Sequence, residues 1–102
     1  MKVYLSGRIT GRIPEARVEF RDAQRRLEAL GHSVVNPFGN GLGEDDAWER
    51  HLAVDIIHLL ECDALCQLPG WEDSLGARLE NEIAVLKGIP RLCDTNKMNV
   101  AI

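Results

Sequence analysis

Short apolar runs alternate along the chain with longer segments in which apolar residues recur every three or four positions. The short runs are typical of buried strands, and they fall at residues 3–5, 33–35, 64–68 and 90–93. The helical spacing predicts three helices, which cover residues 16–30, 48–60 and 79–86. Gly31 and Gly88 follow the first and the third helix as stop signals. In the second helix, a buried stripe is expected at Trp48, Leu52, Ile56 and Leu59.

Alternation of strands and helices predicts an α/β domain with a mainly parallel sheet, because parallel neighbours need crossover connections and the helices supply them. In such sheets, ligands bind beyond the carboxyl ends of the strands. The segments that directly follow strands are therefore the candidate binding loops: residues 6–12, 36–40 and 69–74.

Composition narrows the class of protein. The chain has 102 residues, 45% hydrophobic and 27% charged, which predicts one globular domain over residues 1–102, with the tail 94–102 uninformative. A net charge of −4 makes duplex nucleic acid a poor partner. We find no apolar segment long enough for a membrane span, and we expect a cytoplasmic protein. Three cysteines without C-x-x-C spacing favour buried thiols over a disulfide framework or a zinc site.

Two of the candidate loops contain unusual residues. The segment 6–12 (SGRITGR) combines glycines, hydroxyl groups and arginines, a composition suited to a phosphate or a sugar, or simply to a solvated turn. It has neither the P-loop nor the G-x-G-x-x-G spacing. In the segment 69–74, Trp71 either stacks on a base or sugar at a pocket mouth or covers the core.

Two carboxylates are candidates for chemistry. Asp55 falls at the edge of the apolar stripe of the second helix, where a carboxylate is either paired or functional. His51 and His58 share its helix face, so a metal site and an ordinary solvated face are both open. Glu80 can point toward the carboxyl end of the preceding strand while Glu82 faces elsewhere. Two carboxylates beside one pocket are typical of glycosidic bond cleavage, although composition alone favours an ordinary surface Glu at position 80.

Three stretches together resemble a known superfamily: LSGRITG at 5–11, VVNP at 34–37 and LPGWEDSLGARLE at 68–80. They are similar to the nucleoside 2-deoxyribosyltransferase-like superfamily and, within it, to a small bacterial and phage family whose members mostly lack an assigned activity. The resemblance spans about residues 2–92. It implies a three-layer flavodoxin- or Rossmann-like sandwich with a four- to five-stranded sheet, a homodimer or higher homo-oligomer, and no cofactor or metal.

The resemblance also implies a reaction and its residues. Glu80 would attack C1′ of a 2-deoxyribonucleoside or its 5′-monophosphate, and a second base or water would resolve the covalent intermediate. Asp55 would bind the substrate and assist proton transfer. Ser74 stands where the monophosphate hydrolases have Ser and the transferases Asp. Tyr4 matches an aromatic residue near the sugar. The other implied substrate-binding positions are Ser6, Gly7, Arg8, Gly11 and Gly76, with Trp71 added as the candidate stacking residue.

Departures from the superfamily pattern keep other functions open. Leu79 stands where Tyr or Phe is usual, and Arg78 where a small residue is common. These changes favour a nucleotide-binding or sensing module that kept the fold without turnover. A structural accessory protein, which would bind no ligand, is the third hypothesis.

Overall fold

The structure, a computed structural model, describes residues 1–92 of the chain. Its centre is a four-stranded sheet in the order β2-β1-β3-β4, with all described strand pairs parallel. The strands are β1 (Lys2–Ser6), β2 (Ser33–Val35), β3 (Ala64–Gln67) and β4 (Arg91–Leu92). Cys93, which ends the predicted fourth strand, and the tail 94–102 lie outside the described residues.

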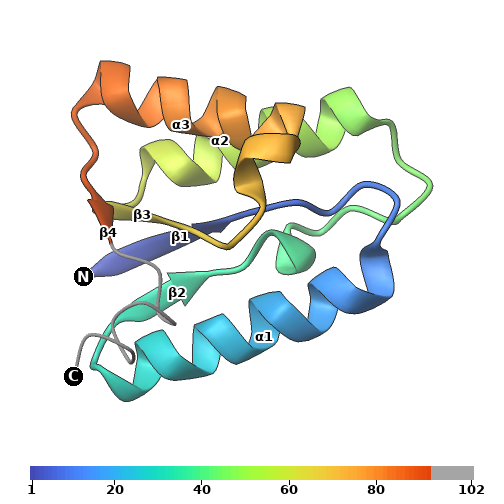
Figure 1. The fold of residues 1–102 in the computed structure, drawn as a ribbon. Helices are drawn as coiled ribbons and strands as arrows, with labels where there is room; N and C mark the ends of the chain where they lie inside the picture. The colour runs from blue at the N-terminus through green and yellow to red at the C-terminus, as the bar shows by residue number, and fades with distance from the viewer. Residues whose placement is uncertain (93–102) are drawn as a thin grey trace.

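Three helices cover the two faces of this sheet (Figure 1). Helix α1 (Ile13–Ala29) lies on one face, and α2 (Trp48–Leu60) and α3 (Leu75–Lys87) lie on the other. Short 3-10 turns follow two of the strands, η1 (Pro37–Gly39) and η2 (Trp71–Asp73). The predicted three-layer α/β sandwich with a parallel sheet is confirmed. None of the helices in residues 1–92 has the length and apolar character of a membrane span.

The pleat of β1 divides the core into two halves. Val3 and Leu5 pack with the buried residues of α1, whereas Tyr4 packs with Leu59 of α2 and Ala84 of α3. Side chains two positions apart on a strand share a face. Ser6, the last residue of β1, therefore points to the same side as Tyr4, toward α2 and α3.

Two helices differ from the sequence expectation. Helix α3 begins at Leu75, one turn before the predicted first residue, because Ser74 caps it by accepting a hydrogen bond from the Ala77 N–H at 3.2 Å. In the predicted buried stripe of α2, Leu59 is buried and Leu52 and Ile56 are half-buried. The prediction is wrong at Trp48, which is 41% exposed. Trp48 is the first residue of α2, and it lies beside a cavity rather than against the sheet.

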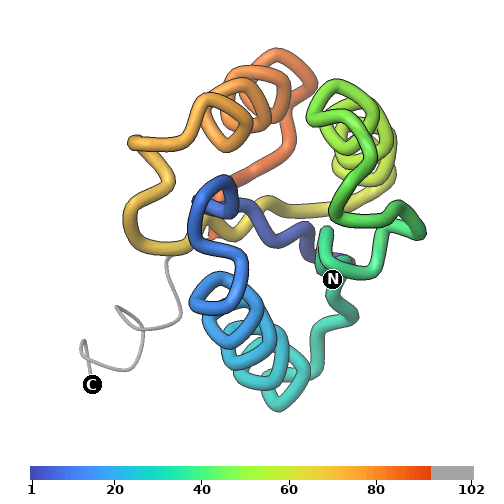
Figure 2. Tube along the Cα trace, turned by 90° about the vertical axis from the view of Figure 1, so that its right-hand side faces the viewer, coloured from blue at the N-terminus to red at the C-terminus, as the bar shows by residue number. Residues whose placement is uncertain are grey.

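The loops after β1, β2 and β3 gather at one end of the sheet. Figure 2 views the molecule from that end, with α1 on one side of the sheet and the α2–α3 pair on the other. Because all strands run in the same direction, their carboxyl ends meet at this edge. This is the end at which the sequence predicts the binding loops.

Candidate functional site

A cavity of about 320 Å³ lies at the carboxyl end of the sheet, between the loop after β1, the loop 40–46 and the facing sides of α2 and α3. It brings together most of the site residues expected from the sequence. Those that line it are Tyr4, Ser6, Gly7, Gly11, Asp55, Ser74, Gly76 and Glu80. Residues from β1 and from two separate helices therefore meet at one place, as expected for a ligand site of a parallel α/β sheet.

Arg8 and Trp71 are not among the residues that line this cavity. Arg8 is exposed, and its carbonyl oxygen accepts a hydrogen bond from Arg12 Nη1 at 3.0 Å. Trp71 lies under the guanidinium group of Arg91, 5.3 Å from the ring centroid. The ring of Trp71 therefore has a protein cation as its stacking partner.

Glu80 is the most buried carboxylate of the cavity, with 6% of the residue exposed. The Tyr4 hydroxyl donates to its Oε2 at 2.6 Å, and the Ser6 hydroxyl donates to its Oε1 at 2.8 Å. Each carboxylate oxygen is thus held by one hydroxyl group of β1. Side chains alternate between the two faces of β1, so Tyr4 and Ser6 lie on the same face, toward α3.

The environment of Glu80 changes its acidity. Burial raises the pKa of Glu80 to about 7; the hydrogen bonds from Tyr4 and Ser6 oppose this rise, and the charge of Asp55 adds to it. Burial and the nearby Glu80 raise the pKa of Tyr4 well above its ordinary value, so its hydroxyl remains a donor. At neutral pH the Glu80 carboxyl group is therefore poised between its ionised and protonated forms.

Asp55 is half-buried in the wall of the same cavity, on α2. Burial raises its pKa, and a hydrogen bond of 3.0 Å from Asn40 Nδ2 to its Oδ1 opposes the rise. Asn40 Nδ2 also lies 3.1 Å from His51 Nδ1. Asn40 and His51 both line the cavity. The sequence singles out neither as a substrate-binding or catalytic residue, and it names His51 only as part of a possible metal site. The only sequence signal for Asn40 is its place in the loop that follows the second strand.

Gln67 is a third residue beside the site that the sequence does not indicate. It is 4% exposed at the end of β3. Its Nε2 donates to the carbonyl oxygen of Ala77 at 3.0 Å and lies 3.5 Å from Ser6 Oγ. Arg91 Nη1 donates to its Oε1 at 3.1 Å. Gln67 thus ties the first turn of α3 to the sheet behind the Ser6 hydroxyl.

The charged residues of the cavity wall are mostly acidic. Glu44 and Asp46 of the loop join Asp55 and Glu80, while Arg17 pairs with Glu44 at 3.0 Å. Within residues 1–92, no three His, Cys, Asp or Glu side chains are grouped to hold a metal ion, and His51, Asp55 and His58 form no such group.

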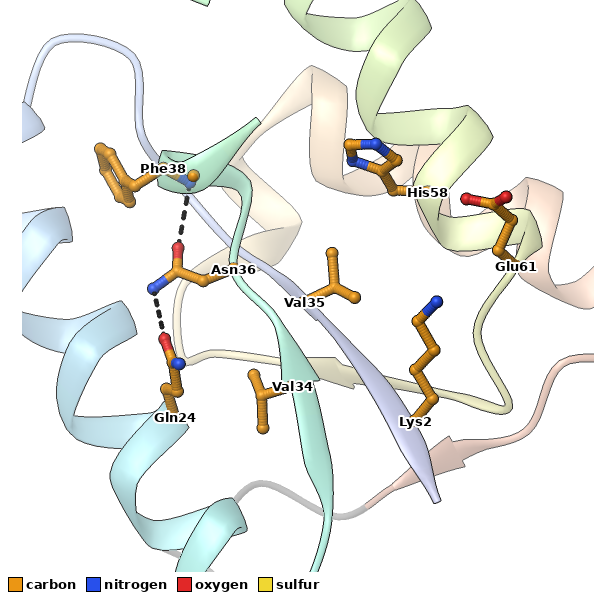
Figure 3. A pocket seen from close by; sticks show the side chains of 9 residues that line it. Lys2, Gln24, Val34, Val35, Asn36, Phe38, His58 and Glu61 are labelled. Carbon is orange, nitrogen blue, oxygen red and sulfur yellow. Dashed lines mark hydrogen bonds between the residues drawn. The ribbon is translucent and has the colours of Figure 1, made fainter. Parts of the chain in front are cut away.

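A second pocket, of about 700 Å³, lies along β2, an edge strand of the sheet formed by residues 1–92 (Figure 3). Lys2, His58 and Glu61 stand on one side of it, and Asn36 and Gln24 on the other. Asn36 donates to Gln24 Oε1 at 3.1 Å and accepts from the Phe38 N–H at 3.0 Å, so both ends of its amide are occupied within the fold. This pocket contains none of the site residues expected from the sequence.

The fold and the cavity define an α/β protein with two carboxylates at the carboxyl end of a parallel sheet. A family model described as a domain of unknown function, DUF4406, matches residues 1–91, and the chain belongs to that family. None of the curated proteins matches the sequence.

The solved structures that share the fold include the following two. A 2-deoxyribosyltransferase from Bacillus psychrosaccharolyticus is similar over 91% of this chain and 71% of its own, with a TM-score of 0.70 and 23% identity. The CMP N-glycosidase BcmB of Clostridium botulinum is similar over 91% of this chain and 67% of its own, with a TM-score of 0.64 and 22% identity. The predicted resemblance to the deoxyribosyltransferase-like fold is therefore confirmed.

Proposed function

We propose that the chain is a cytoplasmic enzyme that cleaves the N-glycosidic bond of 2-deoxyribonucleosides or of their 5′-monophosphates, with Glu80 as the nucleophile. The observation that carries this proposal is the buried Glu80 carboxyl group, which lines the cavity and is held by two hydroxyl groups, 2.6 Å and 2.8 Å away. Burying a carboxyl group without a paired cation reduces stability, so such a group is a candidate for function.

In the first step, a Glu80 carboxylate oxygen attacks C1′ of the sugar. The C1′–N bond breaks and its electron pair goes to the base. In the reactive form the Glu80–Asp55 pair carries one proton, which is on Asp55, and Asp55 gives this proton to the leaving base. A glycosyl ester on Glu80 and a free neutral base result. The hydroxyl groups of Tyr4 and Ser6 fix the direction of the attacking carboxylate.

In the second step, the oxygen of a water molecule attacks C1′ and the ester bond to Glu80 breaks. One proton of the water returns to Asp55, and the sugar leaves with a new hydroxyl group at C1′. If a nitrogen of a second base replaces the water, the same step transfers the deoxyribosyl group. Both outcomes use the same two carboxylates and require no cofactor.

The two similar structures support the choice of bond. One is named for 2-deoxyribosyl transfer and the other for cleavage of the N-glycosidic bond of CMP. Ser74 and the first turn of α3 line the cavity and favour a phosphate group. The carboxylates Glu44 and Asp46 favour an uncharged nucleoside instead. Nucleosides and monophosphates both belong in the test for this reason.

The test is release of free base, followed by chromatography, from each 2-deoxynucleoside and each 5′-monophosphate. We expect release by the unchanged chain and its loss in Glu80→Ala. Glu82→Ala is the matched control, because Glu82 is an exposed carboxylate on the same helix. If no substrate yields base, or if Glu80→Ala retains full activity, the proposed reaction is wrong.

A binding or sensing module without turnover is the second candidate function. It is favoured by Leu79 and by the exposed Arg78, which depart from the superfamily pattern next to the proposed nucleophile. Calorimetric titration with the same nucleosides and monophosphates separates the two functions. Tight binding without base release would support the module.

The outer surface of α2 and α3 supports self-association as a homodimer or higher oligomer. Leu86 is 87% exposed and Val85 is 71% exposed, and the other large exposed apolar residues of these helices away from the cavity are Ile57, Leu60 and Leu75. Such apolar groups on neighbouring helices favour contact with a second copy. Sedimentation should give an oligomer, and Leu86→Lys should shift it toward the monomer; a monomeric unchanged chain would refute this assembly.

A further inference from the structure

A chain of four hydrogen bonds connects the loop 40–46 to Asp55. Asn40 Oδ1 accepts from the Leu42 N–H at 3.0 Å, and Asn40 Nδ2 lies 3.0 Å from Asp55 Oδ1 and 3.1 Å from His51 Nδ1. His51 Nε2 lies 2.8 Å from the carbonyl oxygen of Gly43. Asn40, Leu42, His51 and Asp55 all line the cavity.

These contacts determine the donor and acceptor at each position. A carbonyl oxygen only accepts, so Nε2 of His51 carries the proton and Nδ1 of the neutral ring is an acceptor. The Leu42 N–H only donates, which places the oxygen of the Asn40 amide toward Leu42 and its two N–H groups toward His51 and Asp55. Every polar group of the Asn40 side chain is therefore used.

We propose that Asn40 and His51 are positioning residues, which hold the Asp55 carboxyl group in the orientation that exchanges a proton with the leaving base. This inference rests on the proposed function. Asn40 engages Oδ1 of Asp55, so Oδ2 is the oxygen that gives and takes the proton. His51 acts one step further away: its Nδ1 keeps the Asn40 amide from rotating, and its bond to Gly43 keeps the ring in place.

The same contacts affect the acidity of Asp55. Burial raises the pKa of Asp55, and the hydrogen bond from Asn40 is the largest effect that lowers it; a positive charge on His51 or His58 of α2 would act in the same direction. Glu80 of α3 and Tyr4 of β1 face Asp55 from the other walls, and its charge raises the pKa of both. Loss of the Asn40 bond should therefore raise the pKa of Asp55, by about one pH unit.

The test uses two substitutions of His51, each of which can keep one of its two hydrogen bonds, to Asn40 or to Gly43. In His51→Asn, the amide oxygen can take the place of Nδ1 and accept from Asn40, but the bond to Gly43 is lost. In His51→Gln, the longer amide can reach Gly43, but no acceptor remains for Asn40. Asn40→Ala removes the contact to Asp55 directly. The pKa of Asp55 is read by carbon-13 carboxyl NMR, which needs no turnover, and kcat and KM are measured for base release.

We expect Asn40→Ala and His51→Gln to raise the pKa of Asp55 by about one pH unit and to lower kcat about tenfold, with KM little changed. His51→Asn, which keeps an acceptor for Asn40 but loses the bond to Gly43, should change both values less than His51→Gln does. If Asn40→Ala leaves the pKa of Asp55 in place, or if the two His51 variants behave alike, the positioning function is refuted. If the unchanged chain releases no base, the proposed reaction fails, and the NMR titrations alone decide whether Asn40 and His51 control Asp55.

Discussion

Replacing Glu80 by Gln tests whether burial of this carboxyl group reduces the stability of the folded chain at neutral pH. Gln has nearly the same size as the protonated Glu side chain and can also exchange hydrogen bonds with Tyr4 and Ser6. It carries no charge at any pH. The variant therefore behaves as a form of the protein in which the Glu80 position never ionises.

The size of the effect follows from the pKa of Glu80, which burial raises from an ordinary 4.5 to about 7. A raised pKa in the folded chain stabilises the protein below pH 4.5, and this stabilisation is lost as the pH rises to 7. At about 1.4 kcal/mol for each pH unit, the free energy of unfolding should fall by about 3 kcal/mol over this range. In Glu80→Gln this decrease should be absent.

The measurement is urea unfolding of both proteins at a series of pH values from acid to mildly alkaline conditions. The two stability curves should change together at the acid end and separate toward neutral pH, with Glu80→Gln the more stable protein. Glu82→Gln, on the exposed side of the same helix, is the matched control and should follow the unchanged chain. If the curves of Glu80→Gln and the unchanged chain stay parallel, the reasoning about burial is wrong.

Three further predictions concern Tyr4, Ser74 and Gly7, which line the cavity. Tyr4→Phe removes the hydroxyl group that lowers the pKa of Glu80. The acid limb of the pH-rate profile should therefore move to higher pH, by about one pH unit. An acid limb at the same pH in both proteins would contradict this. Ser74→Ala removes the α3 cap and should lower the free energy of unfolding by about 1 kcal/mol, measured by thermal unfolding. Ser74→Asp should keep the cap and therefore the stability. An equal loss of stability in both variants would refute the capping function of Ser74. Gly7→Ala places a Cβ 3.0 Å from Phe20 Cζ and should cost about 1–3 kcal/mol. In Gly39→Ala, the control, the added Cβ has no neighbouring atom within 4 Å, so the free energy of unfolding should not fall. Equal stability of the two variants would refute the packing argument.

Much of the fold is local in origin and could be predicted. Apolar periodicity marks the strands and helices, and the alternation of these elements requires parallel pairing. The alternation of side chains along a strand places Tyr4 and Ser6 on one face of β1, and in the structure this face lies toward α3. The expectation failed at Trp48, because a periodic pattern does not show where a helix extends past the sheet.

The sequence by itself determined the α/β sandwich, the end of the sheet that carries the loops, and Glu80 and Asp55 as its candidate carboxylates. Only the tertiary structure decided which groups surround them. The Tyr4 hydroxyl meets Glu80 across 76 positions of the sequence, and Asn40 meets Asp55 across 15. Such contacts depend on how helices pack against the sheet, and the same packing leaves Arg8 and Trp71 outside the cavity wall. The periodicity of a single element reports which face is buried, but the pKa of a buried group depends on every element that packs around it.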